Sequence, residues 1–335
     1  MDGCDTSFFE KLEHDNVFFF NVQINDAALR EKIAAKSYRS IDIQNLVNLK
    51  RSETLICVHE YDTNKHSRSF IDNGFTNIID IYWPYQDIHY KSRYGVNAIQ
   101  DVFDEIIDAG RLMADANSID IYFNTLMYRI TYNNSLLLHI SNFDEYIYPC
   151  SKSKSINCII DGGAFDGDSI MTFMDNFSSD TYIYAFEPEY KNFCKLQQNL
   201  IGKPFNGEMI NMALWNKHEV LDFKEDGDGS MVLHDDVSNK TVCVNGIDID
   251  SFMREKMQVP NMIKMDIEGA EIQALHGGSD LISKMKPYLA ISCYHNGHDL
   301  WQIPVLINNF NSRYTFALGH HNPRHSAKGT VLYAM

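Results

Sequence analysis

Cysteine pairs, long apolar runs and basic charge are all scarce in this sequence of 335 residues. Its seven cysteines are odd in number, and no two have the C-x-x-C spacing, which argues against a disulfide framework or a zinc ribbon. No apolar run approaches the roughly 20 residues of a membrane helix, and acids stand near the start where a signal peptide needs bases. We therefore expect reduced thiols, no membrane insertion and a cytoplasmic location.

Basic residues are outnumbered by acids. The chain has 29 lysines and arginines against 45 aspartates and glutamates, a formal net charge of −16. Such a surface repels phosphate backbones, so we expect no nucleic-acid partner and a small-molecule or glycan substrate. Hydrophobic residues make up 44% of the chain, enough for ordinary globular cores. The composition leaves the oligomeric state open.

Residues 1–95 are predicted to form an N-terminal arm and a small α/β domain of unknown role. Helices are expected over 26–36 and 67–73, and buried strands over 55–58 and 78–82. The loop after the first of these strands, HEYDTNK, has no glycine that would let a phosphate approach the backbone. We therefore expect a structural or partner-binding role for this domain and no nucleotide.

Residues 96–150 are predicted to form a helical linker or a cap on the acceptor side of the site. Apolar residues recur at helical spacing over 97–114, and a second helix is expected over 118–131 with Ser118 as its N-cap. The small polar stretch from Ser151 to Ser155 marks the predicted start of the next domain.

From residue 151 to 335, strand-like and helical segments alternate, which predicts an α/β fold with a Rossmann-like, mainly parallel sheet. The expected strands are 156–161, 181–186, 208–214, 261–266, 288–294, 314–318 and 330–334. A short polar loop separates the last two and permits only an antiparallel hairpin, so the sheet should end in an antiparallel strand.

Ligands of such sheets bind beyond the carboxyl ends of the strands, and here those ends carry acids and a histidine. The glycine-rich turn after the first strand lacks the G-x-G-x-x-G spacing of dinucleotide folds, which disfavours an NAD-type oxidoreductase. Asp161, Asp166 and Asp168 crowd this turn and would repel a pyrophosphate. They suit a cationic ligand such as S-adenosylmethionine, whose ribose Glu187 is placed to hold.

Four segments carry a family resemblance: IIDGGAFDGDSIMTF, YAFEPEYKNFCKLQQN, NMIKMDIEGAEIQALHGG and KPYLAISCYHNGHDLWQIPVLI. They resemble the FkbM-type S-adenosylmethionine-dependent methyltransferases, above all a subset found among bacterial surface-polysaccharide genes, over about residues 96–335. The resemblance implies a class I methyltransferase sheet and methyl transfer to a hydroxyl of a sugar or polyketide-like acceptor. Gly319-His320-His321 departs from the family pattern, which often has an arginine before the histidine.

These considerations predict a set of site residues. His295 is expected to act as the general base, since a histidine titrates near neutral pH, and Asp266 to orient the acceptor or the histidine. The predicted cofactor-binding residues are Asp161, Gly163, Phe165, Gly167, Asp168, Glu187 and Asp266.

A bound metal is not favoured. Magnesium held by Asp266, Glu268 and Glu271 is the rival to the histidine base, although either glutamate could instead cap the helix that begins near Gly269. A further histidine group, His295 with His298 and His320, His321 and His325, is expected to be a solvated hairpin rather than a metal site.

Three other features of the sequence bear on the site. Tyr294 and Trp301 offer aromatic faces to a sugar ring, although core packing on a helix over 299–309 is favoured for Trp301. The turn-rich loop at 226–230 lies on the cofactor side. The leading prediction is a carbohydrate O-methyltransferase, and the alternatives are the oxidoreductase and a non-catalytic module that retains the fold.

Overall fold

The computed structural model describes two compact units of the chain. The described residues are 102–131, 134–137, 139–153, 155–224, 231–232, 241–322 and 328–335, with 17–20, 39–41, 54–59, 74–75 and 77–82 nearer the N-terminus. One unit comprises residues 1–103, 121–140 and 322–327, and the other comprises residues 104–120, 141–321 and 328–335. The domain boundaries predicted at residues 95 and 150 stay a prediction.

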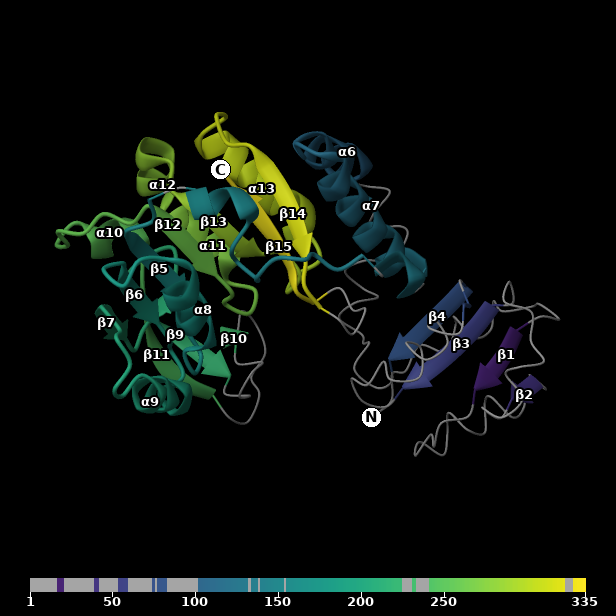
Figure 1. Cartoon of the computed structure of the whole chain (residues 1–335), viewed down its shortest axis with the longest axis horizontal. Helices are drawn as coiled ribbons and strands as arrows, with labels where there is room; N and C mark the ends of the chain where they lie inside the picture. Colours follow the sequence, from purple (N-terminus) through teal and green to yellow (C-terminus); the bar gives the residue numbers. More distant parts are fainter. Residues whose placement is uncertain are drawn as a thin grey trace. The chain divides into compact units, whose positions relative to one another are not determined.

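The first unit contains a parallel sheet of four strands in the order β2-β1-β3-β4 (Figure 1). Strands β3 (Thr54–His59) and β4 (Asn77–Tyr82) confirm the two predicted strands. Strands β1 (Val17–Phe20) and β2 (Arg39–Ile41) were not predicted. The helices expected over 26–36 and 67–73, and the loop after His59, lie outside the described residues.

Two helices follow, α6 (Phe103–Arg111) and α7 (Ala116–Thr131). The N-cap predicted for the second helix is wrong. Asp115 accepts hydrogen bonds from the backbone nitrogen and the hydroxyl of Ser118, at 2.9 and 2.7 Å, so Asp115 performs the capping. The Ser118 hydroxyl instead accepts a hydrogen bond from the backbone nitrogen of Leu318 at 2.9 Å, which ties the helix to strand β14. Short 3-10 turns follow at Asn134–Leu137 and Pro149–Ser153.

The second unit is organised around a seven-stranded sheet in the order β14-β15-β13-β12-β5-β6-β7 (Figure 1). Its strands are β5 (Cys158–Gly162), β6 (Tyr182–Phe186), β7 (Gly207–Ile210), β12 (Met262–Met265), β13 (Tyr288–Ser292), β14 (Phe316–His320) and β15 (Thr330–Ala334). Strand β15 runs antiparallel to both β13 and β14, whereas the other pairs are parallel. The predicted sheet with its antiparallel final strand is therefore confirmed.

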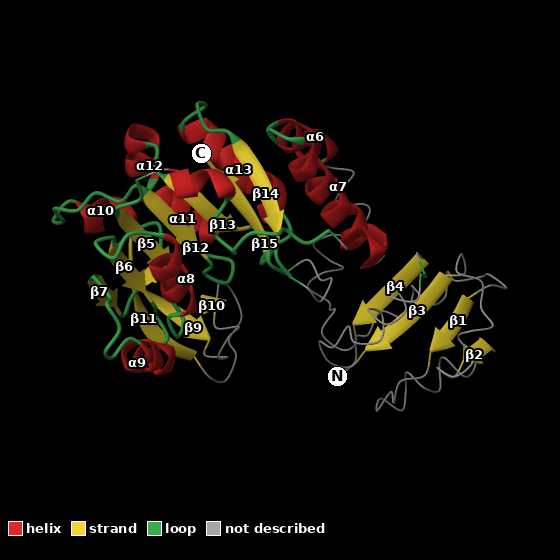
Figure 2. Ribbon diagram, viewed as in Figure 1, coloured by secondary structure: helices red, strands yellow, loops and turns green. Residues whose placement is uncertain are grey.

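Burial explains why these strands form. Every residue of β5, β12, β13 and β15 is buried, as expected for strands covered on both faces. The helices that connect the strands are α8 (Asp168–Asn176), α9 (Tyr190–Asn199), α10 (Ile249–Met253), α11 (Glu271–Gly277), α12 (Ser279–Met285) and α13 (Asp299–Phe310), drawn in red in Figure 2. Trp301 on α13 is buried, which confirms its predicted packing role.

The single strand predicted over 208–214 is wrong, because it divides into β7 and β8 (Ala213–Leu214). Between them, the side chain of Asn211 donates to the backbone oxygens of Glu187 and Pro188 at 2.8 and 3.0 Å, and this turns the chain out of the main sheet. Strand β8 pairs with β11 (Thr241–Ile247), which pairs with β9 (Glu219–Lys224) and, through it, β10 (Met231–Val232). The sequence analysis did not predict this second sheet, and the loop at 226–230 lies outside the described residues.

Across the described part of the chain, every helix is too short or too polar to cross a bilayer.

Candidate active site

The turn after β5 is built against the turn after β12. Gly163 has a φ of +73°, and a Cβ at this position would lie 1.9 Å from the backbone oxygen of Asp266. The backbone nitrogen of Asp266 donates to the oxygen of Gly162 at 3.1 Å. Gly167, with a φ of +98°, then leads into α8 at Asp168. Glycine is required at 163 for both its backbone conformation and the close approach of the second turn.

Asp161 at the end of β5 forms a buried ion pair with Lys264 on β12. The Lys264 Nζ lies 3.0 Å from Asp161 Oδ1, and the Ser169 hydroxyl donates to Asp161 Oδ2 at 2.6 Å. Lys264 also donates to the backbone oxygens of Gly162 and Gly163, at 3.1 and 2.7 Å. Burial alone would lower the pKa of Lys264, but Asp161 raises it overall, so the lysine stays charged.

This ion pair changes the charge expected at the turn. The sequence predicted three crowded carboxylates, but Asp161 is fully buried and neutralised by Lys264. Asp166 is half-buried and Asp168 is exposed, and Asp168 accepts a hydrogen bond from the backbone nitrogen of Ser169 at 2.7 Å. Direct contact of Asp161 with a cofactor stays a prediction. In the structure, Asp161 stabilises the turn through its contacts with Lys264 and Ser169.

Glu187 joins the turn after β5 to the turn after β6. Its Oε2 accepts a hydrogen bond from the backbone nitrogen of Phe165 at 3.0 Å, and its Oε1 accepts one from Glu189 at 2.8 Å. Phe165 has a φ of +46°, so this bond holds a backbone conformation that is uncommon for a residue with a side chain. Burial raises the pKa of Glu187 to about 7 despite these donors. Each carboxylate oxygen retains a free lone pair for a further donor.

Asp266 collects hydrogen-bond donors at the carboxyl end of β12. The hydroxyl of Tyr146 donates to its Oδ2 at 2.8 Å, and the hydroxyl of Tyr294 donates to its Oδ1 at 3.0 Å. Burial alone would raise the pKa of Asp266, but His295 and Lys264 hold it below its usual range. The carboxylate is therefore ionised and anchored, with a quarter of its side chain exposed.

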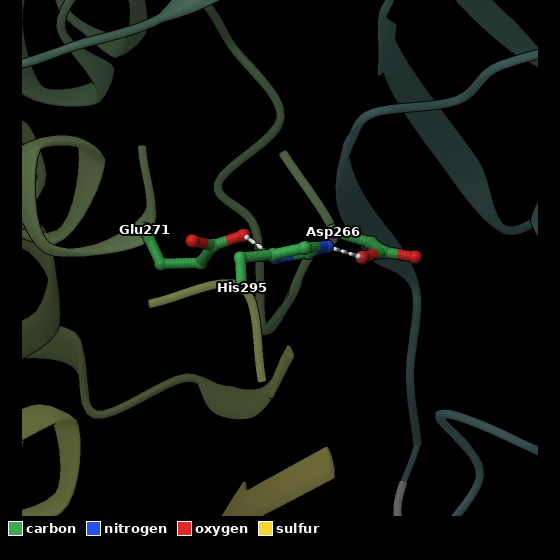
Figure 3. Close-up of side chains that lie close together, drawn as sticks. All are labelled: Asp266, Glu271 and His295. Atoms are coloured by element: carbon green, nitrogen blue, oxygen red, sulfur yellow. Dashed lines mark hydrogen bonds and ion pairs between the residues drawn. The ribbon is translucent and has the colours of Figure 1, made fainter. Parts of the chain in front are cut away.

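His295 lies between three carboxylates (Figure 3 shows two of them). Its Nδ1 is 2.9 Å from Glu271 Oε1, and its Nε2 is 3.3 Å from Asp266 Oδ1 and 3.5 Å from Glu268 Oε2. Burial lowers the pKa of His295, but Glu271, Glu268 and Asp266 raise it to about 10. The expectation that this histidine titrates near neutral pH is therefore wrong for this geometry. Its catalytic role stays a prediction.

The two glutamates after β12 occupy different environments. Glu271 is fully buried at the start of α11, and its Oε1 also accepts from the backbone nitrogen of Ile267 at 2.9 Å. Glu268 has a φ of +54°, and its side chain is one-third exposed. Burial, together with Asp266, raises the pKa of Glu268 to about 7. Glu271 therefore has the predicted position at the start of the helix, where it accepts a backbone hydrogen bond. The same carboxylate also holds the ring of His295.

The other histidines do not join this cluster in the described residues. His298 is half-buried, and His320 is buried with its Nδ1 3.1 Å from the hydroxyl of Thr330. Burial lowers the pKa of His321 to about 4, so it is neutral at physiological pH. The expected solvated hairpin is therefore wrong for His320, and His325 lies outside the described residues.

Sequence reasoning missed Lys264, Glu145 and Tyr146. A single lysine within the apolar run NMIKMD was a usable signal for Lys264, because a charge in a strand buried on both faces needs a partner. No local pattern marked the other two. Tyr146 has a φ of +68°, and burial together with Asp266 raises the pKa of the neighbouring Glu145 to about 7. Both lie beside Asp266 although they precede the first strand of the domain.

The strand order, the antiparallel β15 and the turns at the strand ends define a Rossmann-like methyltransferase fold. Within this class, residues 161–321 match the family model described as the methyltransferase FkbM domain. The resemblance seen in the sequence is therefore confirmed at the level of the family. The polysaccharide-gene subset is not established by this match.

The fold is shared with a solved structure. A methyltransferase FkbM from Methylobacillus flagellatus KT superposes with a TM-score of 0.65 at 18% identity, over 95% of this chain and 89% of that chain. A fibrillarin from Aeropyrum pernix, solved with natively bound S-adenosyl-L-methionine, is more distant, with a TM-score of 0.34, 8% identity, and coverage of 54% of this chain and 67% of that chain. No curated protein sequence gives a significant match.

Proposed function

We propose that this protein transfers a methyl group from S-adenosylmethionine to a hydroxyl oxygen of a carbohydrate. One observation carries the proposal. Asp266 faces the glycine turn with its backbone, against Gly163, and faces the cluster around His295 with its side chain. The predicted cofactor turn and the predicted catalytic residues therefore share one residue. This is the adjacency that methyl transfer between two bound molecules requires.

The residues around the turn fit the charge and shape of S-adenosylmethionine. Gly163 and Gly167 give this turn its positive-φ backbone, and Phe165 and Asp168 border the same turn. Glu187 is buried without an ion-pair partner among the described residues, and its free lone pairs suit neutral donors such as ribose hydroxyls. When bound, the sulfonium would supply an electrophilic methyl group.

The cluster beyond the turn is suited to an acceptor that carries hydroxyl groups. Asp266 and Glu268 present partly exposed carboxylates, which accept hydrogen bonds from hydroxyls and repel phosphates or carboxylates of an acidic acceptor. Tyr294 adds an aromatic ring next to His295, at a centroid separation of 4.1 Å. We propose that His295 and Asp266 act at the acceptor hydroxyl, with Glu271 holding the ring of the histidine in place.

Cofactor binding is the first test. Calorimetric titration with S-adenosylmethionine should give one site per chain, and Glu187→Ala should weaken binding about 10- to 100-fold, because it removes hydrogen bonds to a charged acceptor. The exposed Glu255→Gln is the matched control, since it removes one acid far from the strand ends in sequence and should bind like the wild type. Binding of NAD but not S-adenosylmethionine would overturn the proposal.

The acceptor is tested with methyl-labelled S-adenosylmethionine and a panel of free sugars, nucleotide-linked sugars and polysaccharides. Mass spectrometry and NMR should locate the label as an O-methyl ether on a carbohydrate. Labelling of a nitrogen atom or of nucleic acid, with no carbohydrate labelled, would contradict the proposed acceptor class.

A further inference from the structure

We propose that the cluster around His295 is a binding site for one divalent metal ion. The ligands would be His295 Nε2 and one carboxylate oxygen each from Asp266 and Glu268, and Glu271 would orient the ring through Nδ1. The sequence disfavoured a metal because Glu268 or Glu271 could instead cap the helix that begins near Gly269. The structure adds a histidine nitrogen from the neighbouring strand end, and Figure 3 shows that ring between the two carboxylates of Asp266 and Glu271.

The spacing of the ligand atoms fits a single ion. His295 Nε2 lies 3.3 Å from Asp266 Oδ1 and 3.5 Å from Glu268 Oε2. With metal–nitrogen and metal–oxygen bonds of about 2.0–2.2 Å, these separations correspond to nitrogen–metal–oxygen angles of roughly 105–115°, which is near tetrahedral. Each carboxylate therefore lies close enough to the ring nitrogen to share an ion with it.

The orientation of the histidine points to a ligand at Nε2. Only 7% of the His295 side chain is exposed, and its Nδ1 is held by Glu271 at 2.9 Å. Its buried Nε2 makes no hydrogen bond in the described part of the chain, although it is directed toward two carboxylates. A carboxylate on one ring nitrogen and a metal on the other is the usual arrangement of a metal-bound histidine.

Charge favours the same conclusion. Asp266, Glu268 and Glu271 surround one imidazole, so that a singly charged ring leaves the group negative. A divalent ion placed between these carboxylates and the ring compensates this charge better than a proton does. One nitrogen and two oxygen donors with an open fourth position suit Zn²⁺ or Mn²⁺ better than Mg²⁺, which prefers oxygen ligands in octahedral geometry.

The catalytic use of this ion rests on the proposed function, whereas its binding does not. In the open position the ion would hold the acceptor hydroxyl and lower its pKa, and the proton would leave to water. The resulting alkoxide forms the new oxygen–carbon bond with the methyl group. The carbon–sulfur bond breaks, and the sulfur keeps the electron pair as a neutral thioether.

The experiment is calorimetric titration of the chelator-treated full chain with ZnCl₂ and, separately, MnCl₂ and MgCl₂. We expect one site per chain for Zn²⁺ or Mn²⁺. Glu268→Gln, at a partly exposed position, should weaken this affinity at least tenfold, and Glu271→Gln should weaken it about 10- to 100-fold as the partner of a metal-bound histidine. His298→Ala removes a half-buried histidine outside the cluster and should bind like the wild type. Circular dichroism confirms that each variant folds, and the visible spectrum with Co²⁺ reports a four-coordinate site.

Two results would overturn the proposal. One is that none of the three ions binds at a stoichiometric site. The other is that the wild type and Glu268→Gln bind the metal ion with equal affinity. S-adenosylmethionine binding is measured on the same preparations. Metal binding without cofactor binding would defeat the proposed function and leave the metal site standing, and the converse would defeat the metal site alone.

Discussion

Lys264 and Asp161 form an ion pair of 3.0 Å beneath the glycine turn, with 3% and 0% of their side chains exposed. Two neighbouring strand ends are thereby joined through charges that water does not reach. The same lysine donates to two backbone oxygens of the turn. The pair therefore holds the turn that we propose for the cofactor.

Lys264→Met should lower the free energy of unfolding by about 3–5 kcal/mol, because it leaves the carboxylate of Asp161 buried without its partner. Urea denaturation measures this change. Lys284→Met removes an exposed ion pair with Asp280 and should change stability by less than about 1 kcal/mol. Adding Asp161→Asn to Lys264→Met should recover part of the loss. Equal effects of the two lysine variants would show that burial of the pair has no energetic weight.

Gly163→Ala should disrupt the site, whereas Gly202→Ala should be mild. Both glycines have nearly the same φ, +73° and +74°, so the backbone strain from an added Cβ is alike, at about 1 kcal/mol. Only at 163 does the Cβ meet a backbone oxygen, 1.9 Å away, while nothing lies within 4 Å at 202. Thermal unfolding and S-adenosylmethionine titration of both variants isolate the steric contribution. Indistinguishable melting temperatures would contradict the packing of the two turns.

Glu187 should make stability fall as pH rises from about 5 to 8. Burial raises its folded pKa from 4.5 to about 7, so the folded state binds more protons than the unfolded state between these values. The stability present below pH 4.5 is therefore lost as pH rises through 7. In Glu187→Gln this contribution is absent, and the variant should gain up to about 3 kcal/mol relative to the wild type between pH 5 and 8. Urea denaturation of both proteins at each pH provides the double difference, and a pH-independent difference would refute the shifted pKa.

Tyr146→Phe should destabilise the protein more than Tyr182→Phe. Each hydroxyl donates to one carboxylate, Tyr146 to Asp266 at 2.8 Å and Tyr182 to Glu208 at 3.1 Å. Tyr146 is more deeply buried, so loss of its hydroxyl leaves Asp266 poorly solvated, at a cost of about 1–3 kcal/mol. The loss at Tyr182 is repaired by water. Chemical denaturation of the two variants compares these effects, and a larger loss for Tyr182→Phe would count against an anchoring role for Tyr146.

Local sequence patterns were sufficient to predict the alternation of strands and helices, the antiparallel last strand and the residues at the strand ends. These features follow from local hydrophobic patterns and loop lengths. In a fold of alternating strands and helices, all parallel strands end at the same edge of the sheet, whatever their order in it. Asp161, Glu187, Asp266 and His295 were therefore predicted as site residues from their positions in the sequence. The break between β7 and β8 was not predicted, because it depends on hydrogen bonds from the Asn211 side chain to carbonyl groups that follow a different strand.

Which of these groups meet, and what charge they carry, depends on how the whole domain packs. Lys264 neutralises Asp161 across two strands, and Tyr146 reaches Asp266 from a segment that precedes the sheet. His295 looked like a histidine that titrates near neutral pH, yet three carboxylates from the preceding strand end surround it. A pKa depends on burial and on charges within a few ångströms, and such distances between residues remote in sequence are set by packing rather than by any local pattern.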